Sequence, residues 1–87
     1  MHEARLMANL MRQINEIAKS ERARRVVRVS VRLGALSHFS AEHFAEHFER
    51  ASGGTLAEGA ELVAAVSTDS DDPNALDIVL EGVEVET

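Results

Sequence analysis

The sequence predicts an α+β domain in which two helices pack on a three-stranded sheet, in the order α-β-α-β-β. Three patterns predict it. Apolar residues recur every three or four positions in 4–19 and 40–52, as in amphipathic helices. They alternate with polar residues over 26–33, and two further apolar runs at 60–67 and 76–86 indicate strands. With 87 residues and no internal repeat, the chain is expected to be one domain with a modest core.

The first helix is expected over 4–19, a segment without Gly or Pro whose polar residues fall on the opposite face. Its predicted core stripe consists of Leu6, Met7, Leu10, Met11, Ile14, Ile17 and Ala18.

The first strand is expected over 26–33 and to end at Gly34, with one face formed by Val27, Val29, Val31 and Leu33. The second helix is expected over 40–52, capped by Ser40 and ended by Gly53 and Gly54. Its stripe consists of Ala41, Phe44, Phe48 and Ala51.

The third strand, 76–86, changes phase at Gly82. Leu76, Ile78 and Leu80 share one parity, whereas Val83 and Val85 have the other. A one-residue slip at a glycine indicates a β-bulge. The segment 68–74 before this strand is acidic and rich in turn-forming residues, and is expected to be an exposed loop.

The composition excludes several classes of protein. The chain has no cysteine, which excludes disulfides, thiolate zinc sites and cysteine nucleophiles. No apolar stretch approaches the about 20 residues that span a bilayer. No phosphate-binding loop or nucleophile motif is present, so we expect no enzyme. No signal peptide is visible at the start, so a cytoplasmic location is expected.

Charge is segregated along the chain. Residues 1–34 carry 8 basic and 3 acidic residues, whereas 35–87 carry 1 and 12. The acidic half argues against nucleic-acid binding. The basic residues either form a docking patch or pair with the acidic half of the same fold, and we favour pairing; they include Arg22, Arg24, Arg25, Arg28 and Arg32.

Four histidines are the remaining candidates for chemistry. His43 and His47 stand four residues apart on the second helix, a spacing that can chelate a divalent metal but that also suits a solvated helix edge. His38 precedes that helix and is expected to be a hydrogen-bonding loop residue.

His2 has a distinctive position at the start of the chain. The α-amine of Met1, deprotonated backbone nitrogens of His2 and Glu3, and the His2 imidazole can supply four nitrogens to one metal. Such a planar set suits Ni(II) or Cu(II) rather than tetrahedral zinc. Binding releases protons, so affinity is expected to rise with pH.

Four separated segments, which together span nearly the whole chain, resemble the nickel metallochaperones of the HypA/HybF family, which help to mature [NiFe]-hydrogenase and, in some organisms, urease. The resembling segments are Met1-His2-Glu3 with the striped helix behind it, Val29 to Ser37, Gly54 to Leu62, and Val83 to Glu86. The resemblance implies an α-β-α-β-β nickel-binding domain, with nickel held at Met1, His2 and Glu3.

The sequence differs from the family pattern at one place. Family members insert a zinc domain with two CxxC pairs between the second and third strands, where this chain has only the loop 67–75 and no cysteine. A short connection is easily made if these strands are antiparallel neighbours, because a hairpin needs few residues. We therefore expect a single nickel-binding domain over 1–87, with His38, His43 and His47 as candidate auxiliary ligands.

The leading hypothesis is a carrier that delivers Ni(II) to a nickel enzyme. The family implies a GTPase accessory protein and the hydrogenase large subunit, or another nickel-enzyme precursor, as partners. A homodimer is a further arrangement that would bury more surface. The alternative is a zinc-less paralogue that acts as an adaptor or accessory subunit without metal. A third hypothesis places a tetrahedral metal site at His43 and His47, and this site does not require His2.

Overall fold

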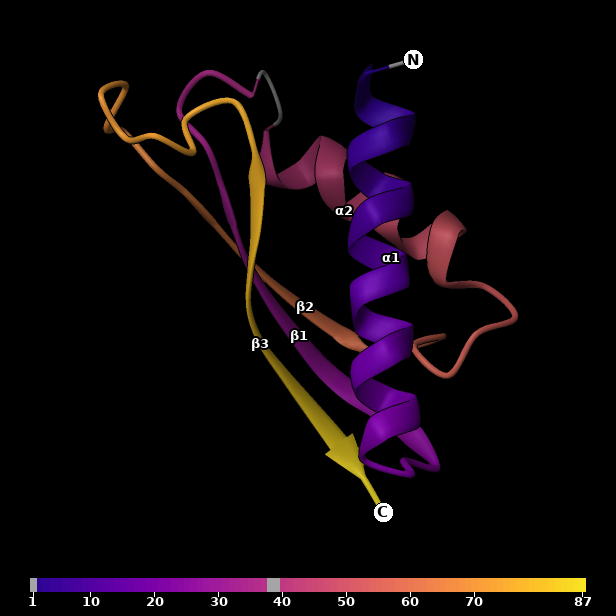
Figure 1. Cartoon of the computed structure of the whole chain (residues 1–87). Coiled ribbons are helices and arrows are strands. Elements are labelled where there is room, and N and C mark those ends of the chain that lie inside the picture. The colour runs from indigo at the N-terminus through magenta and orange to yellow at the C-terminus, as the bar shows by residue number, and fades with distance from the viewer. Residues whose placement is uncertain (1, 38–39) are drawn as a thin grey trace.

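The computed structural model describes residues 2–37 and 40–87 of the chain, with side chains from residue 4 onward. The elements follow the predicted order, with both helices on one face of the sheet (Figure 1). They are α1 (His2–Ser20), β1 (Arg25–Leu33), α2 (Ala41–Ser52), β2 (Glu61–Val66) and β3 (Ile78–Glu86). The two ends of the chain lie at opposite ends of the molecule, which measures 38 × 21 × 19 Å.

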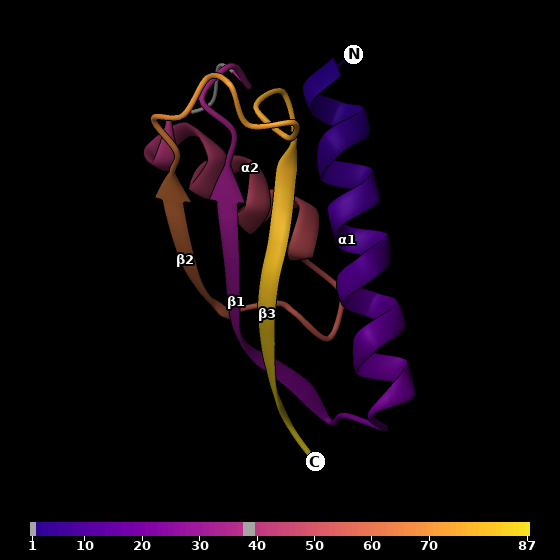
Figure 2. The same cartoon turned by 60° about the vertical axis from the view of Figure 1, so that its left-hand side comes forward.

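The strand order is β2-β1-β3, so β1 is the central strand (Figure 2). It pairs parallel with β2 and antiparallel with β3. The second and third strands are therefore not neighbours, and the condition under which a hairpin would make their connection short is not met. The reason is that α2 carries the chain back to the start of the sheet, so that β2 is laid parallel to β1. The last strand then takes the edge of β1 that is still open.

A loop over 67–77 crosses the end of β1 to connect the two outer strands. Backbone hydrogen bonds hold it there: Ser67 N donates to Leu33 O at 2.9 Å, Gly34 N to Asp77 O at 2.9 Å and Leu36 N to Ala75 O at 2.7 Å. Two strand spacings amount to about 10 Å, which a segment of this length covers easily. The short connection is thus a strap across the sheet and not a hairpin.

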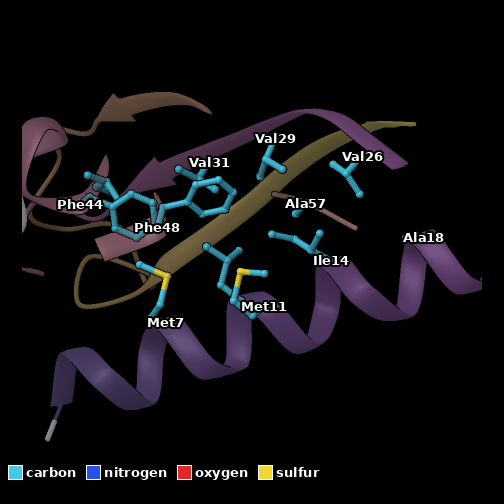
Figure 3. Packing of buried hydrophobic residues seen from close by; sticks show 12 residues of the cluster. Met7, Met11, Ile14, Ala18, Val26, Val29, Val31, Phe44, Phe48 and Ala57 are labelled. Atoms are coloured by element: carbon cyan, nitrogen blue, oxygen red, sulfur yellow. The ribbon is translucent and has the colours of Figure 1, made fainter. Parts of the chain in front are cut away.

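The core lies between the helices and the inner face of the sheet (Figure 3). Phe44, Ile14, Leu33, Val26, Val29 and Val31 are its largest fully buried side chains. Along α1 the buried residues are Met7, Leu10, Met11, Ile14 and Ala18. Ile17, predicted to belong to this stripe, is 37% exposed, because the buried face is centred closer to Met7 and Met11.

Two irregularities interrupt the pairing of β1 with β3. One falls between Ser30 and Val31, opposite Gly82 and Leu80, which confirms the predicted bulge. The other falls between Val26 and Arg28, and the sequence did not predict it. It turns Val26 inward and leaves Val27 38% exposed, so Val27 is wrongly placed in the predicted core. The prediction that Leu76 belongs to the third strand is also wrong, because Leu76 precedes β3 and is 56% exposed.

The second helix has the predicted boundaries. The Ser40 hydroxyl accepts a hydrogen bond from His43 N at 3.0 Å, as an N-cap does. Gly53 follows its last residue, and Gly54 has a φ of 79°, a conformation that favours glycine. Phe44 and Phe48 anchor its inner face in the core. No helix in the described part of the chain is long and apolar enough to cross a membrane.

Candidate metal site

The backbone amides of His2 and Glu3 belong to the first turn of α1. The first four N–H groups of an α-helix have no acceptor within the helix. Deprotonating these two amides for a metal therefore costs no hydrogen bond of the helix interior. Met1 lies outside the described residues, as do the side chains of His2 and Glu3. The set of four nitrogens stays a prediction.

The start of α1 lies at the end of the molecule where β1 and β2 end and where the strap 67–77 crosses (Figures 1 and 2). The strap carries Asp69 and Asp71, both exposed, and the half-buried Asp72. Asn74 and Asp77 face α1 across a shallow groove whose other wall includes Leu6 and Asn9. Carboxylates gathered at one end of a molecule attract cations to it. The acidic strap thus lies at the same end of the molecule as the start of α1.

His43 and His47 project side by side from α2, with ring centroids 4.6 Å apart and the rings tilted by 43°. His47 is half-buried and His43 is exposed. His38, the third candidate auxiliary ligand, lies outside the described residues. Among the side chains of 4–37 and 40–87, no three His, Asp or Glu residues gather closely enough to hold a metal ion. The described side chains thus bring together the histidine pair and no further ligand for it.

An open groove of about 870 Å³, which the sequence pattern did not predict, runs between α1 and α2. Its floor and walls are mostly apolar and include Ala4, Met7, Ala8 and Met11. His47 lines the same groove, together with residues of α1 from Ala4 to Lys19. The signal in the sequence was the pair Ala4 and Ala8, small residues four positions apart at the edge of the apolar stripe. The rim of the groove carries the cations Arg12, Lys19 and Arg50 and the anion Glu16.

Ion pairs across the outer face of the sheet account for three of the basic residues. Arg28 pairs with Glu61 at 3.3 Å and with Glu84 at 2.6 Å. Arg25 pairs with Glu86 at 3.3 Å. Arg32 pairs with Glu81 at 3.4 Å and with Asp72 of the strap at 3.9 Å. The prediction that the basic half pairs with the acidic half is confirmed for these residues.

The pKa of the Arg28 guanidinium is raised, first by its hydrogen bond to Glu61 and then by the charges of Glu61 and Glu84. A raised pKa means that the stabilisation is fully present below the ordinary arginine range and is lost only above it. The raised pKa of Arg28 therefore adds no pH dependence to stability near neutrality.

Residues 1–69 match the family described as "Hydrogenase/urease nickel incorporation, metallochaperone, hypA". The chain therefore belongs to the HypA family of nickel metallochaperones. It is 36% identical over 63 residues to a hydrogenase maturation factor HypA from Picosynechococcus, an alignment that covers 72% of this chain and 56% of that protein. The chain thus spans little more than half the length of this curated relative.

A solved structure extends the likeness to the whole fold. The solution structure of the Ni metallochaperone HypA from Helicobacter pylori superposes with a TM-score of 0.78 and 19% identity. The match covers 99% of this chain and 98% of that one. At this identity the likeness concerns the fold, and it includes β3, which lies beyond the residues matched by the family.

Proposed function

We propose that this chain is a nickel carrier that delivers Ni(II) during the maturation of a nickel enzyme such as [NiFe]-hydrogenase. The observation that carries the proposal is the family match, which begins at residue 1 and so includes Met1-His2-Glu3. The ligands are the α-amine of Met1, the backbone nitrogens of His2 and Glu3, and the His2 imidazole. A planar set of four nitrogens is a coordination that Ni(II) accepts readily.

The position of these residues supports a role in transfer. His2 and Glu3 form the start of α1 at one end of the molecule, where backbone amides lack partners within the helix. A metal held there can be approached by another protein without opening the core. Loading requires loss of protons from the amine and the amides, so acidification favours release.

We propose the GTPase accessory protein and the hydrogenase large subunit, or another nickel-enzyme precursor, as the partners. The groove between α1 and α2 supports docking beside the nickel ligands, because its wall includes Ala4, one residue after Glu3. We further propose that 1–87 acts as a single nickel-binding domain, in which the loop 67–75 replaces a zinc module. This chain has no cysteine with which to build a thiolate zinc site.

The decisive experiment is a Ni(II) titration of untagged protein with a free Met1 amine, followed by visible absorption. We expect a yellow, diamagnetic 1:1 complex that disappears in His2→Ala and in protein whose Met1 α-amine is blocked by acetylation. His47→Ala is the matched control, because it removes an imidazole elsewhere and should leave the complex unchanged.

Other outcomes favour the other functions. A complex that survives His2→Ala but is lost in His43→Ala and His47→Ala assigns the metal to the histidine pair on α2. Protein that forms no nickel complex fits the alternative, an adaptor or accessory subunit that keeps the fold without the metal.

A further inference from the structure

The outer edge of β2 is a strand edge with no partner among the described residues, because β2 is the last strand on its side of the sheet. Five consecutive residues along it, Leu62 to Val66, carry no charge. Val63 is 45% exposed and Val66 is 50% exposed. Natural proteins usually protect such an edge with charges, a proline or a bulge. Leu62 to Val66 contain neither a charge nor a proline, so the edge is suited to pairing with another strand.

A hollow of about 400 Å³ adjoins this edge on the helix-covered face of the sheet. Ala45 and Phe48 of α2 line one side, and Gly59, Ala60 and Leu62 line the other. The hollow lies at the start of β2, whereas the exposed Val66 lies at its end. Within one copy, Val66 is thus a strand length away from the hollow.

We propose that β2 pairs antiparallel with β2 of a second copy, about a two-fold axis at Val63, to form a continuous six-stranded sheet. Residues whose numbers add to 126 then stand opposite each other: Val63 faces Val63, Leu62 faces Ala64 and Glu61 faces Ala65. A two-fold axis perpendicular to the sheet keeps the helices of both copies on one face, so only even sums are allowed.

The hollow selects this register among the even ones. Val66 of the second copy then stands opposite Ala60 and points to the helix-covered face, as Leu62 and Ala64 do. It therefore enters the hollow beside Phe48, and symmetry repeats the contact at the other end of the strand pair. A shift by two residues places Val66 opposite Leu62 or Glu58 and leaves Ala60 without this apolar partner.

Charge complementarity selects the same register. Ala65 lies opposite Arg32 of β1, and both are on the outer face. Glu61 of the second copy, opposite Ala65, is thus two strands from Arg32, about 10 Å between backbones, with only a methyl group between them. Glutamate and arginine side chains together cover this distance. The row Glu84, Arg28 and Glu61 within one copy then continues to Arg32 of the other.

The absence of cysteine permits a direct test by cross-linking. Residues directly opposite in an antiparallel pair have Cβ atoms about 4.5–5.5 Å apart, close to disulfide geometry. We expect Val63→Cys to form a covalent dimer under mild oxidation at least about tenfold faster than Leu76→Cys, a more exposed site away from β2. Equal rates for the two variants would overturn the proposal.

Sedimentation equilibrium over a range of protein concentrations tests the same interface without a covalent bond. The unmodified chain should form a dimer, and Val63→Arg should weaken it by about tenfold or more, because two like charges then meet on the axis. Leu76→Arg adds the same charge elsewhere and should leave the dimer intact. A chain that stays monomeric at all concentrations, or a dimer indifferent to Val63→Arg, refutes this pairing. Neither result bears on nickel binding at His2.

Discussion

Gly34 has no room for a side chain, although its backbone has an ordinary conformation. A Cβ at this position would lie 2.2 Å from Ala75 O and 2.5 Å from Asn74 O. The backbone of the strap is held against Gly34 by the hydrogen bonds of Gly34 N to Asp77 O and Leu36 N to Ala75 O. Gly34, which follows the last residue of β1, thus allows the backbone of the strap to pack closely against the end of that strand.

Gly34→Ala is therefore expected to destabilise the protein by about 2 kcal/mol or more, since backbone atoms of the strap must move. Gly82→Ala is the matched control, because a Cβ there meets nothing within 4 Å and φ is not positive. It should change stability by less than about 0.5 kcal/mol. Urea unfolding followed by circular dichroism measures both. Similar losses in the two variants would contradict the close contact at Gly34.

At the scale of elements, α2 depends on its N-terminal cap. The Ser40 hydroxyl accepts from His43 N, and α2 positions both the histidine pair and the connection to β2. Ser40→Ala is expected to cost about 1 kcal/mol of stability, as the loss of an N-cap usually does. Ser70→Ala, in the exposed strap, should cost almost nothing. Thermal unfolding compares the two, and a neutral Ser40→Ala would mean that another group caps α2.

The helices and strands themselves were predictable, because the apolar residues that each element buries recur with the period of a helix or of a strand. The helices were visible from three- and four-residue spacing, and the bulge at Gly82 from a change of parity. The neighbours of each strand were not predictable. Alternation tells which residues share a face, but β1 pairs with β2 and β3 through contacts that no local pattern encodes. The sequence did not predict the bulge at Val27, because Val26 and Val27 are both apolar and either could be placed in the core.

The candidate site was only partly predictable, for a related reason. The nitrogens of Met1, His2 and Glu3 are adjacent in the chain, so chemistry alone suggests them. The groove between α1 and α2 needs the packing of two distant helices, and Ala4 and Ala8 do not indicate it alone. The pair of His43 and His47 was visible as a spacing, whereas its place beside α1 required the fold.

At the scale of the whole molecule, the proposed ligands have an unusual thermodynamic consequence. All four nitrogens lie within three consecutive residues, so an unfolded chain can bind nickel as well. A ligand stabilises the folded state only as far as it prefers that state. We therefore expect saturating Ni(II) to change the free energy of unfolding by less than about 0.5 kcal/mol.

Urea unfolding with Ni(II) and with a chelator tests this. A stabilisation of about 2.7 kcal/mol at a hundredfold excess over Kd would mean that the fold supplies ligands. His38, His43 and His47 would then be the residues to replace, singly and together. In the chelator alone, the unfolding midpoint should equal that of untreated protein, because the core consists of apolar side chains.

The central place of β1 also sets the order of events during synthesis. Its first residue, Arg25, pairs with Glu86 at the end of β3, sixty-one positions later. A nascent chain that has left the ribosome only as far as β2 still exposes one edge of its central strand. The sheet closes when β3 emerges, and such distant pairing makes folding slow for a chain of this size. Until then, β1 is the segment that most needs protection from association with other chains.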